Sequence, residues 1–179
     1  PYSSFKEGDN PARTMKSFGY HMCLYPIEMP HAGTMYVDAF GTYDIDENVF
    51  IPSTVTVPSN VTLTVVKDFD AGLQNMAAGN AGDNNDGSIV EHCTTTGYGS
   101  SGGSIKWTYD KSKAAWSSPS IRDSSEDFFT ASGDGFFLWV KTEAAGKLRL
   151  EGQGVVPKAD GSGDEWAAAY CDVEVVAGE

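Results

Sequence analysis

The sequence is short of basic residues, and this shortage sets the first limits on function. Lysine and arginine number 12 against 25 aspartates and glutamates, so the formal net charge is −13. Such a surface repels nucleic-acid phosphates and anionic lipid. We therefore expect no nucleic-acid partner. The chain also lacks any apolar run of about 18 residues or more, so we expect no membrane span.

Cysteine and histidine are equally scarce. Cys23, Cys93 and Cys171 permit one disulfide at most and leave one thiol over. An odd count argues against a scaffold built on disulfides, and the sequence leaves open whether any two of the three pair. The chain starts at Pro1 without an initiator methionine, which indicates a processed or trimmed form.

The clearest pattern that is present lies in residues 134–152. Its second half alternates leucines with charged residues over 147–151, as a strand with one solvent-facing side does. Its first half places three apolar side chains on one face, namely Phe136, Leu138 and Val140. Residues 143–146 offer a short turn in which Gly146 can take a positive φ. The stretch predicts a β-hairpin, on which the other strands would pack.

Further strands are predicted along the chain, separated by turns rich in Gly, Pro, Asn and Asp. They cover residues 19–25, 34–40, 49–51, 54–57, 61–66, 88–93, 104–109 and 165–176. Residues 68–78 are the best candidate for one short helix, capped by an aspartate and ended by Gly79. The sequence thus predicts an all-β antiparallel sandwich of jelly-roll or immunoglobulin-like type. Residues 1–17 form a polar N-terminal arm in this interpretation, and residues 18–179 form a single domain.

Two glycine-rich motifs suggest chemistry that the rest of the chain does not support. Residues 99–103, Gly-Ser-Ser-Gly-Gly, have a passing likeness to the serine loop of trypsin-like proteases. That chemistry also needs a histidine base and a carboxylate, and His21, His31 and His92 carry no family signature. Residues 97–102 match G-x-G-x-x-G, but no following helix is evident, so we reject dinucleotide binding. We interpret the run as a surface loop and expect no catalytic residue, no cofactor and no enzyme.

Metal binding is a further hypothesis, with two candidate regions. One gathers soft ligands of the kind that copper(I) prefers, namely His21, Met22, Cys23, Met29, His31 and Met35. No recognised ligand spacing is met there, and several of these residues also suit a core. The other comprises the acidic turns 83–87 and 160–165, which offer oxygen ligands for calcium but do not match the twelve-residue calcium loop. Both regions remain open at this point, and we assign no metal ligand.

Aromatic residues raise the question of carbohydrate binding. The four tryptophans, together with eight tyrosines, could supply a stacking platform. Trp107 and Trp139 lie in predicted strands and suit the core. Trp116 and Trp166 flank turns and are the better candidates for such a platform.

The leading functional hypothesis is a non-catalytic structural or assembly subunit, for example of a virion, a surface, a filament or a shell. It would make protein–protein contacts with copies of itself or with other subunits, through sheet edges and the 1–17 arm. The alternatives are a secreted carbohydrate-binding module and an extracellular copper- or calcium-binding sandwich. Low cysteine use fits either a reducing interior or a virion, and the location that we expect is extracellular or at a virion surface.

Overall fold

A computed structural model of the chain describes residues 17–45, 61–79, 87–99, 102–113, 119–123, 125 and 135–178. In this part of the chain the backbone forms ten strands and one 3-10 turn, η1. The strands are β1 (Ser17–Tyr25), β2 (Ala32–Ile45), β3 (Val61–Lys67), β4 (Met76–Ala78), β5 (Ser88–Cys93), β6 (Ser104–Asp110), β7 (Ile121–Asp123), β8 (Gly135–Thr142), β9 (Gly146–Pro157) and β10 (Asp164–Val175); η1 spans Lys111–Lys113.

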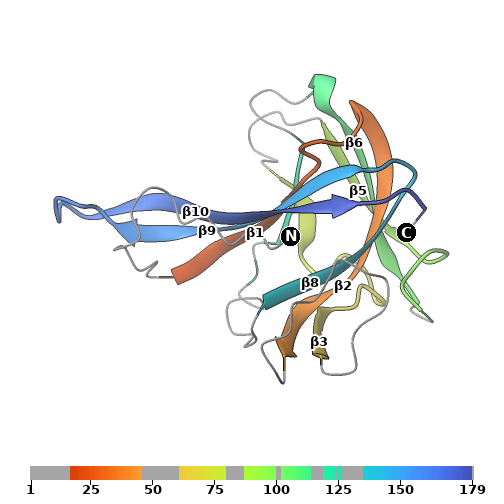
Figure 1. Cartoon of the computed structure of the whole chain (residues 1–179), viewed down its shortest axis with the longest axis horizontal. Helices are drawn as coiled ribbons and strands as arrows, with labels where there is room; N and C mark the ends of the chain where they lie inside the picture. Colours follow the sequence, from red (N-terminus) through yellow and green to blue (C-terminus); the bar gives the residue numbers. More distant parts are fainter. Residues whose placement is uncertain are drawn as a thin grey trace.

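The strands form two antiparallel sheets (Figure 1). Sheet A has the order β10-β9-β1-β7-β4. Sheet B has the order β3-β2-β6-β5, and β8 also pairs with the long strand β2. The prediction of an all-β antiparallel sandwich is therefore confirmed. Short strands β4 and β7 were not predicted, and β2 runs further than the sequence suggested, to Ile45.

Alternating side chains from both sheets meet in one core. Sheet A contributes Met22 and Leu24 from β1 and the two leucines of β9, while β2 and β6 of sheet B contribute the largest set. That set comprises Met35, Val37, Phe40, Ile105, Trp107 and Tyr109, all at most 2% exposed. These strands place every second residue inward, which is the period that the sequence showed, except between Val37 and Phe40, where β2 is distorted.

Strands β8 and β9 do not form the hairpin that their sequence predicts. Strand β8 pairs with β2 in sheet B, whereas β9 pairs with β1 and β10 in sheet A. The chain therefore crosses from one sheet to the other between Thr142 and Gly146. Gly146 has no positive φ in this crossing; a Cβ there would collide with the carbonyl of Glu28 and lie 2.6 Å from Met29 Sδ. Phe136, Leu138 and Val140 share one face of β8, as predicted, and all three pack against the core.

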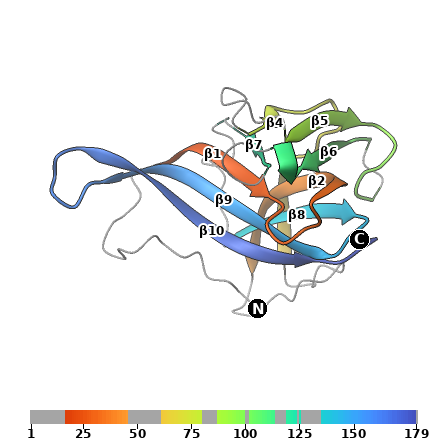
Figure 2. The same cartoon turned by 90° about the horizontal axis from the view of Figure 1, so that it is seen from above.

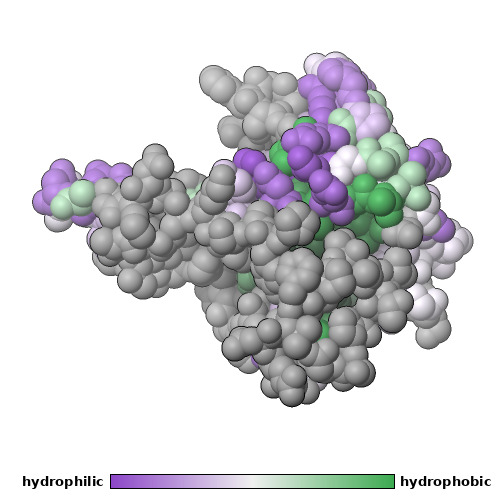
Figure 3. Space-filling model, viewed as in Figure 1, coloured by the Kyte–Doolittle hydropathy of each residue, from purple (hydrophilic) through white to green (hydrophobic). Residues whose placement is uncertain are grey.

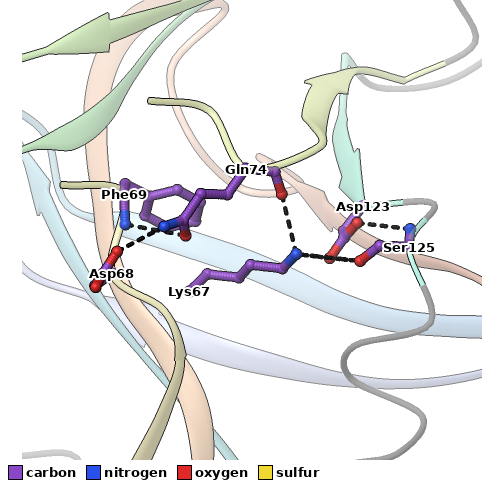
Figure 4. A network of polar contacts seen from close by, with 6 residues as sticks. All are labelled: Lys67, Asp68, Phe69, Gln74, Asp123 and Ser125. Atoms are coloured by element: carbon purple, nitrogen blue, oxygen red, sulfur yellow. Dashed lines mark hydrogen bonds and ion pairs between the residues drawn. The ribbon is translucent and has the colours of Figure 1, made fainter. Parts of the chain in front are cut away.

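The predicted helix at 68–78 is wrong, since these residues form a turn followed by β4. Positive φ angles at Phe69, Gly72, Gln74 and Asn75 are incompatible with a helix. Side chains take the place of helical hydrogen bonds: Phe69 N donates to Gln74 Oε1 at 3.2 Å, and Gln74 Nε2 donates to Asp68 Oδ1 at 2.6 Å (Figure 4). Phe69 and Met76 nevertheless belong to the core, at 0% and 2% exposure.

Next to this turn, a buried ion pair joins the two sheets. Lys67 ends β3 in sheet B, and Asp123 ends β7 in sheet A. Lys67 Nζ lies 3.3 Å from Asp123 Oδ2, and the two side chains are 3% and 0% exposed. The ammonium also donates to Gln74 O at 3.0 Å and to Ser125 Oγ at 3.1 Å, so three oxygens surround it (Figure 4).

Strand β9 instead forms a hairpin with β10, and this hairpin projects from the sandwich (Figure 1, Figure 2). Its register runs without a shift from Gly146 opposite Val175 to Pro157 opposite Asp164. Strand β1 accompanies it only as far as Ser17, which lies opposite Val155. The predictions for the 1–17 arm, except Ser17, and for strands at 49–51 and 54–57 fall outside the described residues.

Candidate functional site

Four residues from four strands lie in one row across the outer face of sheet B. Cys93 of β5 lies opposite Ser104 of β6, and Asp38 of β2 lies opposite Trp139 of β8. The last β2–β6 pair is Val37 with Ile105. Asp38 directly follows Val37 and Ser104 directly precedes Ile105, so Asp38 and Ser104 are also neighbours across these two strands. The loop 94–99 lies over this row, because Asp38 and Ser104 are 1% and 0% exposed although they point away from the core. We call Cys93, Ser104, Asp38 and Trp139 the covered row.

A buried carboxylate fixes the covering loop. Asp38 Oδ2 accepts a hydrogen bond from Tyr98 N at 2.6 Å, and Oδ1 accepts one from Ala39 N at 2.7 Å. Ala39 has a φ of 45°, a conformation that alanine adopts at a cost of about 1 kcal/mol or more. Here β2 changes its partner from β6 to β3 and the register shifts. Asp38 therefore stabilises both the distortion of β2 and the loop above it.

The loop brings Tyr98 against Trp139. Their ring centroids are 6.2 Å apart with an interplanar angle of 49°, and Tyr98 is 40% exposed. Trp107, by contrast, is fully buried, and its Nε1 donates to Ser88 Oγ at 3.1 Å, as its core assignment predicted. Trp116 and the side chain of Trp166, the predicted platform, lie outside the described part. The core assignment of Trp139 is wrong, because Trp139 is half-buried and lies outside the core, on the face of β8 opposite to Leu138. Tyr98 and Trp139 thus form an aromatic pair at the surface that sequence reasoning missed.

The other end of the covered row carries a thiol and a hydroxyl. Cys93 Sγ is 3.5 Å from Thr95 Oγ1, and hydrogen bonding from this hydroxyl lowers the pKa of Cys93. The Ser104 hydroxyl, fully buried, has no hydrogen-bond partner among the residues that the structure describes. Burial instead raises the pKa of Cys23 to about 11 and that of Cys171 above its ordinary value. All three cysteines are free thiols, so none of them forms a disulfide.

The glycine-rich run at 99–103 serves packing in the part that is described. A Cβ on Gly103 would collide with the carbonyl of Phe69 and lie 2.6 Å from His92 Nε2. His92 Nε2 is itself 2.8 Å from Phe69 O, and Gly102 N donates to Asp70 Oδ1 at 2.7 Å. These contacts join the run to the turn at 68–75. The imidazole of His92 is therefore engaged with a backbone carbonyl; the serines of the run lie outside the described residues.

The soft-ligand residues are not brought together as one group. Met22, Met29 and Met35 are buried in the core, whereas Cys23 lies on the opposite face of β1 from Met22. His31 is exposed in the turn before β2, and nothing is described of the His21 side chain. Within the described ranges, no group of three or more His, Cys, Asp or Glu side chains is placed to hold a metal ion.

Of the two acidic turns, only the one at the hairpin tip can be followed. Asp160 Oδ1 accepts from Ser162 N at 2.9 Å, a local bond typical of aspartate in turns. The tip, residues 158–164, is exposed and coloured mainly hydrophilic in Figure 3. Residues 83–86 lie outside the described part.

A polar network covers the outer face of sheet A near the base of the hairpin. Arg149 of β9 holds Asp172 of β10 through two hydrogen bonds of 2.7 and 3.1 Å, and its guanidinium lies 3.8 Å from the centre of the Tyr170 ring. The carboxylate raises the pKa of Arg149. Gln153 donates to Glu151 at 2.6 Å and to Tyr25 at 3.2 Å, which connects β9 to β1.

No protein-family model, curated protein or solved structure matches this chain. Among the described residues, no helix is long and apolar enough to cross a membrane.

Proposed function

We propose that this protein is a structural subunit that assembles with copies of itself or with other subunits through the β10 edge of its projecting hairpin. The observation that supports the proposal is the edge itself. Strand β10 is at the end of sheet A, and over 166–171 its described backbone pairs with β9 alone. The outward N–H and C=O groups of such a strand can pair with a further strand.

Edge strands in monomeric proteins usually carry features that prevent such pairing, such as short length, lysine, proline or a bulge. Strand β10 has twelve residues, no lysine or proline and an unbroken register with β9. The opposite edge of sheet A, β4, has three residues. The two edges of the same sheet therefore differ sharply in their capacity for strand addition.

The projection adds a second reason. A two-stranded ribbon is marginally stable by itself in water, and it gains stability when a third strand or a partner covers it. Beyond Ser17 no described strand accompanies β9 and β10, while the ribbon there still carries Val156 opposite Glu165 and ends in a polar turn. A partner strand along β10 would extend sheet A where the described strands do not.

The test is light scattering over a range of protein concentrations, combined with hydrogen exchange of individual amides. We expect oligomers, and we expect the outward amides of residues 166–171 to become protected as oligomers form. The amides of Glu151 and Gly152, paired on both sides by β1 and β10, should be protected at every concentration. A strict monomer, or oligomers with unchanged exchange in β10, would refute the proposal.

A pair of neighbouring variants sharpens this test. Successive residues of a strand direct their N–H groups to opposite sides. Of Ala167→Pro and Ala168→Pro, one therefore removes a hydrogen bond to β9 and the other removes only an outward N–H. The variant that removes only an outward N–H should keep the melting temperature of the protein and lose assembly.

Carbohydrate binding is a second candidate, favoured by the surface pair of Tyr98 and Trp139. Asp38 fixes the backbone of Tyr98, so the pair needs little ordering when a sugar ring stacks on it. A glycan array should then give hits that Tyr98→Ala abolishes and Tyr170→Ala, on the other sheet, retains. An array without hits would eliminate this candidate.

A further inference from the structure

Cys93 differs from the other two cysteines in its surroundings. It ends the edge strand β5 with its side chain partly exposed on the outer face of sheet B. Cys23 is 3% exposed, and Cys171 packs against the core. Thiolates react and buried thiols do not, so access and stabilisation of the anion decide reactivity. The hydroxyl of Thr95, 3.5 Å from Cys93 Sγ, lowers the pKa of Cys93, whereas burial raises the pKa of Cys23 and that of Cys171.

The hydroxyl of Ser104, beside Cys93, indicates that an acceptor can bind here. Ser104 lies directly opposite Cys93 in the antiparallel pair, so their Cβ atoms are about 5 Å apart on the same face. Its side chain is fully buried, and within the described part of the chain its hydroxyl makes no hydrogen bond. Burying a hydroxyl without a partner costs free energy of about 1 to 3 kcal/mol. An oxygen atom added to Cys93 Sγ would lie within reach of this donor.

We propose that Cys93 is a peroxide-reactive thiol whose sulfenic acid is stabilised by the buried hydroxyl of Ser104. The thiolate of Cys93 attacks one oxygen of hydrogen peroxide, an S–O bond forms and the O–O bond breaks. Sulfur is oxidised by two electrons, the peroxide is reduced, and the distal oxygen leaves as hydroxide, which combines with the proton that the Cys93 thiol released on ionising to give water. The oxygen now on sulfur accepts the Ser104 hydrogen bond. A small thiol then condenses with the sulfenic acid to a mixed disulfide and water, and a second small thiol returns Cys93 to the thiol and leaves as the small disulfide.

Oxidation of Cys93 takes place on the outer face of sheet B and does not depend on assembly at β10. Cys93 and β10 lie on different sheets, so the oxidation can be measured on monomer or oligomer alike.

The experiment treats the whole protein with hydrogen peroxide at neutral pH and traps sulfenic acid with dimedone, followed by peptide mass spectrometry. We expect Cys93 to be labelled at least about tenfold faster than Cys23 or Cys171. Delayed addition of dimedone then measures the lifetime of the sulfenic acid. We expect Ser104→Ala to shorten this lifetime about fivefold, as loss of one hydrogen bond predicts.

Ser88→Ala is the matched control. Ser88 is also a buried serine in the β5–β6 pair, but its hydroxyl accepts from Trp107 on the core side. It should leave the lifetime at Cys93 unchanged, and urea unfolding verifies that both variants are folded. Equal labelling of the three cysteines would overturn the assignment of Cys93. Fast labelling with a lifetime that Ser104→Ala does not alter would overturn the role of Ser104.

Discussion

Two ion pairs in this molecule have similar chemistry and opposite surroundings. Arg149 and Asp172 meet at 2.7 Å, with side chains 29% and 31% exposed, and they connect neighbouring strands of the hairpin. Lys67 and Asp123 are farther apart, at 3.3 Å, but are 3% and 0% exposed and connect the two sheets. Water already stabilises the charges of the first pair, so the bond adds little. In the second pair each charge depends on its protein partners, so burial decides the energetics more than distance does.

The largest effect is expected from breaking the buried pair. Lys67→Met leaves the Asp123 carboxylate buried without its cation, and the free energy of unfolding should fall by about 3 to 5 kcal/mol. The double variant Lys67→Met with Asp123→Leu removes both charges and should recover most of this loss. Urea unfolding measures both. If Lys67→Met lowered the free energy of unfolding by no more than the loss of a surface ion pair does, burial would not decide the energetics of this pair.

Asp38 tests the effect of burying a charge without an ion pair, because two backbone amides hold its buried carboxylate. Asp38→Ala leaves the amides of Ala39 and Tyr98 without their acceptor, and we expect a loss of about 2 to 4 kcal/mol. Asp38→Asn keeps an acceptor oxygen and should cost less. Hydrogen exchange at the Tyr98 amide should accelerate in both variants, more strongly in Asp38→Ala. An unchanged Tyr98 amide would show that other contacts hold the loop.

Cys23 extends the comparison to an ionisable group that the fold keeps neutral. Burial raises its pKa from 9.0 to about 11, so the native state binds the proton more tightly than the unfolded state does. Stability from this group is complete below pH 9 and declines as the pH rises toward 11, by about 2 to 3 kcal/mol in total. Urea unfolding across this range should show the decline. Cys23→Ala should reduce it, whereas Cys93→Ala should not.

The smallest effect is expected at the surface pair. Arg149→Ala removes the bond to Asp172 and the contact with the Tyr170 ring, and should cost about 1 kcal/mol or less. The loss should shrink further in high salt, which screens exposed charges. The salt dependence of urea unfolding measures this directly. A loss as large as that of Lys67→Met would erase the contrast between the two pairs.

Local alternation allowed much of the fold to be predicted from the sequence. It predicted the sheet class, most strand positions and the face that Phe136, Leu138 and Val140 share, because the period of a strand is visible in a few residues. It could not distinguish a hairpin from a crossing between sheets at Thr142–Gly146. Both connections need a short turn between two alternating segments, and only distant partners, β2 for β8 and β1 for β9, decide between them.

The covered row could not be predicted from the sequence for a related reason. Its members come from four strands, and only the register of β2, β5, β6 and β8 brings them together. The helix prediction at 68–78 failed because Gln74 and Lys67 satisfy the backbone of the turn, an interaction that helix propensity ignores. One usable signal was present: Asp38 is a charged residue inside an apolar strand segment, and such a residue needs a partner when buried.

The pairing of β1 with β9 sets a timetable for synthesis. Cys23 leaves the ribosome roughly 130 residues before its neighbour across the sheet, Glu151. At a translation rate of about 5 to 20 residues per second, β1 waits roughly ten seconds for this partner, with its backbone hydrogen-bonded to water. Sheet A can therefore be completed only after β9 has been made.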